Sequence, residues 1–264
     1  MVKILTMKKF LLLATLFSVS FTLAQKTPIK INAENGLLKI NQLKPGVKEY
    51  LVYFTDGTKT QRTNGDIWKR ETSFKKHQGK DAIFFKWTAF ANGKPYRQTL
   101  NICDAKTLSP IHHKTTIQKI GDERIDARAG VFAYDFHKDK MVPSDSIQNN
   151  RAVESGPKPI TIPIVSWEQD LETFPLLPIT KVGEIFDVAF FDPNEKSTQY
   201  HQYFVSGKEK LKLNEDTSVE CWVLENHEGG DKNYSKFWMS TKSKEVLKME
   251  QYFNGNYRFK VLQF

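Results

Sequence analysis

The chain has 264 residues, of which 39 are Lys or Arg and 30 are Asp or Glu, and its formal net charge is +9. Its two cysteines lack the close spacing of a metal-binding motif, which argues against a cysteine-based metal centre. After residue 24 no apolar run is long enough to cross a bilayer, so the sequence predicts no transmembrane segment there.

The first 24 residues have the pattern of a secretory signal peptide. Lys8 and Lys9 precede an apolar run over 10–23 that ends at Ala24. We expect cleavage after Ala24 and export of residues 25–264, so that the protein is periplasmic or secreted. Export makes nucleic acid a poor partner. The excess of basic residues then suits either an anionic envelope surface or a solvated lysine-rich face.

Residues 25–136 are predicted to form an N-terminal β-module. Runs rich in aromatic and β-branched residues recur about every ten residues and are separated by turn residues, which is typical of antiparallel sheets. The first run, 29–42, is predicted to be a hairpin around Asn35-Gly36. Further strands are predicted at 49–54, 58–69, 82–90, 96–103, 111–120 and 122–135.

Residues 137–180 are predicted to be a proline-rich connection. The prolines between 141 and 166 forbid a helix or a central strand in that stretch. Ser166 is a candidate N-cap with Gln169 three residues later, which predicts one short helix that Pro175 and Pro178 end.

Residues 181–264 are predicted to form a C-terminal β-module, with strands at 182–191, 199–206, 210–213, 219–225, 234–240, 246–253 and 257–264. The apolar pattern favours a three-residue loop, 254–256, over a two-residue Asn-Gly loop in the last hairpin. Phe253 then pairs with Tyr257, and Met249 and Phe259 share the buried face. The wet face carries Lys248, Glu250, Arg258 and Lys260.

An internal similarity links the two predicted modules. Residues 102–108 and 111–117 align with residues 238–244 and 247–253, because each set is a strand, a polar turn with a central Lys, and a long strand. The alignment suggests that the two halves of the chain are related.

Few residues offer catalytic chemistry. His112 and His113 are adjacent on a predicted strand and point to opposite faces, so they cannot jointly bind one metal. The chain has no Gly-x-Ser-x-Gly elbow and no phosphate-binding loop. We predict no catalytic residues, no metal and no cofactor. The carboxylates that could serve a glycosidase, but that also suit ordinary wet faces, are Glu168 with Asp170 and Glu220 with Glu225.

Cys103 and Cys221 both lie in apolar strand patterns. Export permits a disulfide between them, and two free buried thiols are the alternative.

The aromatic residues are the strongest indication of a binding site. The chain has 19 Phe, 9 Tyr and 5 Trp, and many of them cluster on predicted strands. A curved sheet with an aromatic concave face holds an apolar ligand, although such residues also fill ordinary cores. The candidate ligand-binding residues are Phe85, Trp87, Tyr203, Trp222 and Trp238.

Several short segments resemble the DUF3108 family. They include Cys221-Trp-Val-Leu-Glu225 and Phe237-Trp-Met-Ser240, together with the step Cys103-Asp-Ala-Lys-Thr-Leu108-Ser-Pro110 in the first half. The resemblance implies an exported or envelope-associated protein with curved antiparallel sheets, similar to lipoprotein-carrier half-barrels. It brings no catalytic residues with it.

The predicted architecture is therefore all-β: two curved antiparallel modules joined by a proline-rich connection with one short helix. The first hypothesis is a non-enzymatic envelope protein that binds an apolar or lipid-like ligand. One alternative is a hydrolase of envelope glycans or lipids. Another is a ligand-free structural protein that binds an envelope protein along a sheet edge.

Overall fold

A computed structural model describes residues 27–63, 65–191, 195–227 and 230–264 of the chain. The predicted signal peptide, 1–24, lies outside the described residues. Strands dominate the described residues, which confirms the predicted all-β class.

One sheet contains the sixteen strands of the described chain, with β10 beside β11 and the others in the order β1-β11-β12-β13-β14-β15-β16-β2-β3-β4-β5-β6-β7-β8-β9. The first half supplies β1 (Ile29–Ile31), β2 (Gly46–Thr55), β3 (Asp66–His77), β4 (Lys80–Ala91), β5 (Lys94–Asp104), β6 (Pro110–Ile117), β7 (Gly130–Phe136) and β8 (Lys140–Pro143). The second half supplies β9 (Lys158–Pro159), β10 (Val165–Ser166), β11 (Ile185–Phe191), β12 (Gln199–Lys212), β13 (Ser218–Asn226), β14 (Tyr234–Ser240), β15 (Val246–Phe253) and β16 (Asn256–Leu262).

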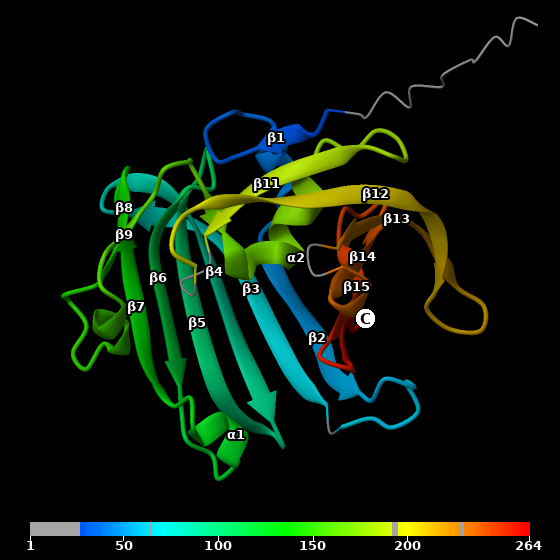
Figure 1. Ribbon diagram of the computed structural model, residues 1–264, viewed down its shortest axis with the longest axis horizontal. Coiled ribbons are helices and arrows are strands. Elements are labelled where there is room, and N and C mark those ends of the chain that lie inside the picture. The colour runs from blue at the N-terminus through cyan, green and yellow to red at the C-terminus, as the bar shows by residue number, and fades with distance from the viewer. Residues whose placement is uncertain (1–26, 64, 192–194, 228–229) are drawn as a thin grey trace, which may run out of the picture.

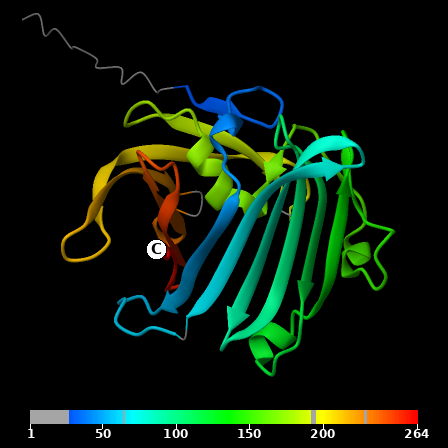
Figure 2. The ribbon, with the colours of Figure 1, turned by 180° about the vertical axis from the view of Figure 1, so that it is seen from behind.

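The sheet curls into two walls that face each other (Figure 1). The long strands β2 to β7 form one wall, and β11 to β15 form the other. The pairing of β16 with β2 joins the two walls into one sheet. Figure 2 shows the same arrangement from behind. The division of the chain into two modules, 25–136 and 181–264, remains a prediction, since both segments share one sheet and one core.

Side chains close the gap between the two ends of the sheet. Met141 of β8 and Ala189 of β11 are fully buried in one cluster with Ile164 of the connection. The Thr198 hydroxyl also accepts a hydrogen bond from the backbone N–H of Thr161, at 3.0 Å. The result is a curved sheet that surrounds a central space.

Short helices interrupt the strands: η1 (Ile40–Gln42), α1 (Glu123–Asp126), η2 (Arg151–Ser155), η3 (Trp167–Gln169), α2 (Asp170–Thr173), η4 (Phe174–Leu176) and η5 (Gly230–Lys232). Helix α1 corrects the strand predicted over 122–135. Its N-cap Asp122 accepts a hydrogen bond from the backbone N–H of Arg124, so β7 begins only at Gly130.

The hairpin predicted over 29–42 is wrong. Strand β1 pairs in parallel with β11, so that Ile29 lies opposite Phe186 and Ile31 opposite Val188. The Asn32 side chain then accepts hydrogen bonds from the backbone of Glu34 and Asn35, which turns the chain away from β1. Burial of Ile31 against the distant strand decides this pairing.

The three-residue loop predicted for the last hairpin is also wrong. Asn254 and Gly255 form a two-residue turn with φ of 50° and 80°, and Phe253 pairs with Asn256. Met249 consequently lies opposite Lys260 and shares its face. The apolar pattern misled because Lys260 and Arg258 face the interior, whereas Phe259 lies on the outer face.

The outer position of Phe259 is stabilised by other aromatic rings. It stacks on Tyr53 with ring centroids 5.0 Å apart, and Lys59 lies 4.1 Å from the centre of the neighbouring Tyr257 ring. Phe259 is therefore buried without belonging to the central core.

The predicted internal similarity is confirmed by the geometry of two turns. Leu108, between β5 and β6, and Lys244, between β14 and β15, both have positive φ, 61° and 57°. In each turn their backbone N–H bonds to the carbonyl four residues earlier, that of Asp104 or of Ser240. The side chains of Asp104 and Ser240 also accept backbone N–H bonds within their turns. The two halves therefore repeat one hairpin.

Cys103 and Cys221 are both buried and free. Burial raises the pKa of each thiol, to about 12 for Cys103 and about 11 for Cys221, so neither is a reactive thiolate.

Candidate functional site

A short helical stretch enters the space between the two walls. We call residues 167–177, which comprise η3, α2 and η4, the inserted segment. Leu171, Phe174 and Leu176 are almost completely buried and anchor it in the core. The predicted short helix is thus confirmed. The Ser166 side chain makes no capping hydrogen bond, however, and Pro175 lies inside the last turn instead of following it.

Three acids of the inserted segment reach three different strands. Glu172 forms a two-point ion pair with Arg70 of β3, with N···O distances of 2.8 and 2.6 Å. Asp170 accepts a bond of 2.8 Å from Lys260 of β16. Glu168, the third acid, forms an ion pair with Arg97 of β5. The inserted segment is therefore held by opposite charges as well as by apolar packing.

Because these pairs are buried, each charged group depends on its partner to stay charged. Burial by itself disfavours the charge on Arg70, but the adjacent Glu172 carboxylate outweighs that effect and raises the pKa of Arg70 above its ordinary value. It likewise opposes ionisation of Asp170, but Lys260 and Arg70 hold the pKa of that carboxyl below its usual range. Burial lowers the pKa of Lys260 to about 8, against the attraction of Asp170.

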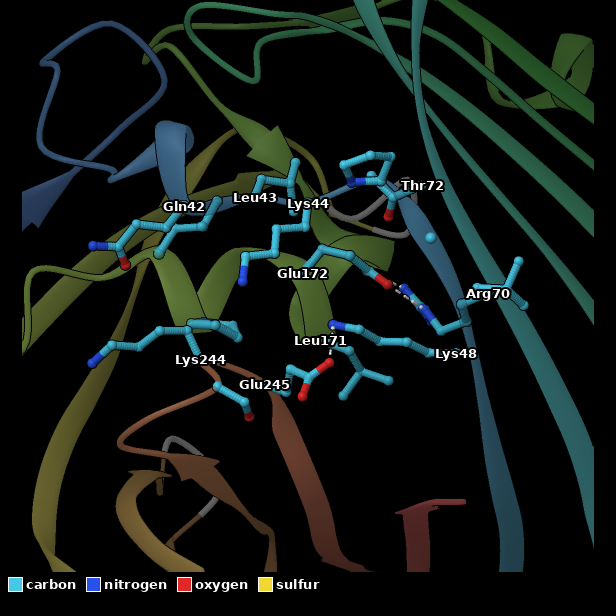
Figure 3. A pocket seen from close by; sticks show the side chains of 16 residues that line it. Gln42, Leu43, Lys44, Lys48, Arg70, Thr72, Leu171, Glu172, Lys244 and Glu245 are labelled. Carbon is cyan, nitrogen blue, oxygen red and sulfur yellow. Dashed lines mark hydrogen bonds and ion pairs between the residues drawn. The ribbon is translucent and has the colours of Figure 1, made fainter. Parts of the chain in front are cut away.

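One cavity, of about 220 Å³, lies where the chain enters β2 (Figure 3). Figure 3 shows the Arg70 and Glu172 side chains meeting at one side of it. Lys48 reaches Glu245, with Nζ and Oε1 3.2 Å apart. These four charges are already paired, so a ligand gains little from them. The cavity is also smaller than the three described next, which makes it the weaker candidate.

Three larger spaces lie on the other side of the inserted segment. The aromatic cavity, about 380 Å³, is lined by Trp167, Phe174, Phe190, Tyr203, Phe237 and Met249 with several polar residues. The arginine cavity, about 270 Å³, is lined by Arg97, Arg124, Arg128 and Arg258 with Trp68 and Tyr96. The side cavity, about 430 Å³, includes His113, Phe132, Tyr134 and Trp167.

The three cavities adjoin through shared walls. Arg258 lines both the aromatic and the arginine cavities, and Trp167 lines both the aromatic and the side cavities. Arg97 and Arg128 line both the arginine and the side cavities. Together we call these spaces the lumen. Each is near or within the range of volumes that small-molecule sites occupy.

Buried polar atoms without a hydrogen-bond partner in the described part of the chain gather at the lumen. They include Arg258 Nε, Gln251 Oε1, Glu168 Oε2 and Glu195 Oε2, and all four residues line lumen cavities. Native proteins contain few such atoms, because each one that stays unpaired costs desolvation free energy. Their concentration here marks a place where water or a ligand bonds.

The five predicted ligand-binding residues are scattered around this region. Tyr203 lines the aromatic cavity, with its ring centroid 4.7 Å from that of Phe174. Phe85 and Trp87 are buried, and Arg97 lies over the Trp87 ring at 4.5 Å.

The other two predicted residues lie away from the lumen. Trp222 lines a much smaller cavity of about 20 Å³. Trp238 donates to Glu209 and lies opposite Lys248, away from Met249 and the lumen.

Most of the lumen residues, above all Arg97 and Arg258, were not predicted from the sequence, because charged residues on a strand were expected to face water. The spacing of Glu168, Asp170 and Glu172 in a segment whose other residues are mostly apolar is the pattern that indicates buried cations, because buried acids need partners.

The two histidines lie on opposite faces, as predicted. His112 pairs with Asp135, with Nδ1 and Oδ1 2.6 Å apart, and His113 is buried beside Trp167. Burial lowers the pKa of His113 to about 4. Within the described ranges, no group of three His, Cys, Asp or Glu side chains is arranged to hold a metal ion. In the same ranges, no helix has the length and apolarity to cross a membrane.

Solved structures similar to this chain include two proteins of low sequence identity. A β-barrel-like DUF1849 protein from Brucella abortus is 10% identical, with 84% of this chain and 96% of that chain covered and a TM-score of 0.44. A DUF1329 family protein from Desulfovibrio piger is 9% identical, with 85% of each chain covered and a TM-score of 0.27. No curated protein sequence matches the chain.

The sequence itself matches one family over most of its length. The match covers residues 49–261, from within β2 to within β16, and so includes both walls and the inserted segment. The family description is "Protein of unknown function (DUF3108)", and the chain belongs to this DUF3108 family.

Proposed function

We propose that the chain is a non-enzymatic, exported protein of the cell envelope that binds an amphipathic, lipid-like molecule in its lumen. The observation that carries the proposal is the set of adjoining cavities between the walls of the sheet. Their aromatic and aliphatic side chains, among them Phe174, Phe237 and Met249, offer contact surface to an apolar chain, and the polar groups beside them suit an amphipathic ligand. Export rests on the secretory pattern of residues 1–24.

The residues that a hydrolase would use are engaged in structural pairs. Glu168 and Asp170, a candidate carboxylate pair, bind Arg97 and Lys260. His113 forms hydrogen bonds with Asn101 on the neighbouring strand β5 and with Thr115 on its own strand β6. These contacts favour binding over hydrolysis.

Native mass spectrometry of residues 25–264, purified without detergent, tests the binding. We expect a reproducible added mass that solvent extraction releases as a lipid. Ser235→Trp, which fills the aromatic cavity, will abolish the added mass, whereas Ser218→Trp on the exposed end of β13 will retain it. A bare protein mass, together with no uptake of an anthroyloxy-labelled fatty acid, would refute lumen binding and favour the partner-binding alternative.

Export is tested separately. Cell fractionation followed by N-terminal sequencing should find the chain outside the cytoplasm and beginning at Gln25. An uncleaved cytoplasmic chain would contradict this part of the proposal.

A further inference from the structure

The arginine cavity carries more positive charge than its surroundings neutralise. Four arginines line it, and Asp66 is the acid among its lining residues. Asp122 binds Arg124 at 2.8 Å, and Glu168 binds Arg97. No described carboxylate forms an ion pair with Arg128 or Arg258, so two guanidinium groups remain against one carboxyl.

Asp66 is a single carboxyl with a partner of its own. Burial raises its pKa, whereas the Tyr96 hydroxyl donates to it at 2.8 Å and favours the charged form. Even when ionised, one carboxylate does not balance both Arg128 and Arg258.

Arg258 is the most unusual of these groups. Its Nε is buried and has no hydrogen-bond acceptor in the described part of the chain. Asp170 of the inserted segment lines the aromatic cavity together with Arg258, but it already accepts from Lys260 and from the backbone N–H of Leu171. An arginine keeps its charge at every physiological pH, and a buried Nε–H without an acceptor costs desolvation free energy.

Arg258 also stands between two chemically different spaces. On one side lies the arginine cavity and on the other the aromatic cavity, with Phe237 and Met249 in its wall. A molecule with an anionic end and an apolar body matches this arrangement, with its anionic end in the arginine cavity and its apolar body in the aromatic cavity. Guanidinium groups bind phosphate or carboxylate with two parallel hydrogen bonds, which would satisfy Nε.

We infer that the arginine cavity is a subsite for the anionic group, phosphate or carboxylate, of the molecule bound in the lumen, with Arg258 and Arg128 as its direct partners. The inference rests on the proposed function, because it places the body of the same molecule in the aromatic cavity. It restricts the ligand class to anionic amphiphiles, and Arg258 is the residue that sets this specificity.

Isothermal titration calorimetry with three probes tests the subsite. Dodecyl phosphate carries both chain and anion, dodecyl maltoside carries the same chain with an uncharged headgroup, and inorganic phosphate carries the anion alone. We expect dodecyl phosphate to bind at least ten times more tightly than either other probe. Arg258→Gln and Arg128→Gln should each weaken its binding about tenfold or more, and leave dodecyl maltoside unaffected.

Arg62→Gln is the matched control, because Arg62 is exposed and lies over Tyr53 on the outer face. Equal binding of dodecyl phosphate and dodecyl maltoside, unchanged in both lumen variants, would overturn the anionic subsite and leave lumen binding intact. If inorganic phosphate binds as tightly as dodecyl phosphate and both variants abolish it, the subsite stands as a free-anion site and the lipid-like ligand is refuted. Binding of none of the probes would overturn both.

Discussion

Arg70 and Arg258 both extend into the interior, yet their surroundings differ. Arg70 is 5% exposed and forms a two-point pair with Glu172, whereas Arg258 has a buried Nε without a partner among the described residues. The two arginines should therefore respond to mutation in opposite ways.

Arg70→Met leaves the Glu172 carboxylate buried without its cation. We expect a loss of about 3–5 kcal/mol in the free energy of unfolding, measured by urea denaturation. The double variant Arg70→Met, Glu172→Leu should recover most of that loss, because no unpaired charge remains. A single variant as stable as the parent would show that the pair does not hold the inserted segment.

Arg258→Met should leave stability unchanged or raise it. The substitution removes an unsatisfied buried donor and keeps a side chain of similar length. Thermal unfolding without ligand measures this effect. A loss of more than about 2 kcal/mol would indicate that Arg258 has a structural role in the empty protein.

His113 should make the fold sensitive to acid. Burial lowers its pKa from 6.5 to about 4, so the unfolded chain binds the proton first and stability falls as the pH drops through this window. The loss is at most about 1.4 kcal/mol for each pH unit. His113→Gln should flatten this part of the profile in urea denaturation between pH 7 and 4, and an unchanged slope would disprove the assignment.

At the scale of single elements, the repeated turn after β5 and after β14 offers a matched test. Both Leu108 and Lys244 have positive φ, which favours glycine, but Leu108 is 1% exposed and Lys244 is partly exposed. The same substitution therefore has two different costs.

Lys244→Gly should stabilise the protein by up to about 1 kcal/mol, because glycine adopts this backbone conformation without strain. Leu108→Gly should destabilise it by about 2–5 kcal/mol through the loss of a buried side chain. Urea denaturation of both variants measures the difference. Equal effects of the two substitutions would contradict the difference in burial between Leu108 and Lys244.

The sequence predicted that the inserted segment contains a short helix, but it did not predict that this segment ties strands of both halves together. Its acid spacing links three strands from both halves of the chain, β3, β5 and β16. It thereby separates the small cavity at the start of β2 from the lumen.

At the scale of the whole molecule, β16 is the strand that joins the two walls. Removal of residues 256–264 deletes the pairing with β2 and also leaves Asp170 without Lys260. We expect the truncated chain to lose its cooperative thermal transition, as followed by circular dichroism.

Removal of Phe264 alone is the control, because this residue is 84% exposed. We expect the melting temperature of this shortened chain to match that of the full chain, because the exposed terminal side chain lies outside the core. A large loss of stability on removing Phe264 would contradict the structure.

The sequence by itself determined the local architecture. Alternating residues and turn signals predicted β14 (Tyr234–Ser240) and β15 (Val246–Phe253) with their observed bounds, as well as the inserted helix and the repeated turn at Leu108 and Lys244. These features depend on neighbours within a few residues, which is the range over which sequence patterns carry structural information.

Only the tertiary structure decided which face of a strand points inward and which strands that are distant in sequence pair with each other. Alternation divides β16 into two faces, one with Arg258 and Lys260 and the other with Tyr257 and Phe259, and hydrophobicity alone chose the wrong one. The charged face is internal because Asp170, 90 residues before Lys260, supplies the opposite charge. Such compensation depends on contacts distant in sequence, and the parallel pairing of β1 with β11 and the arginine cavity depend on them in the same way.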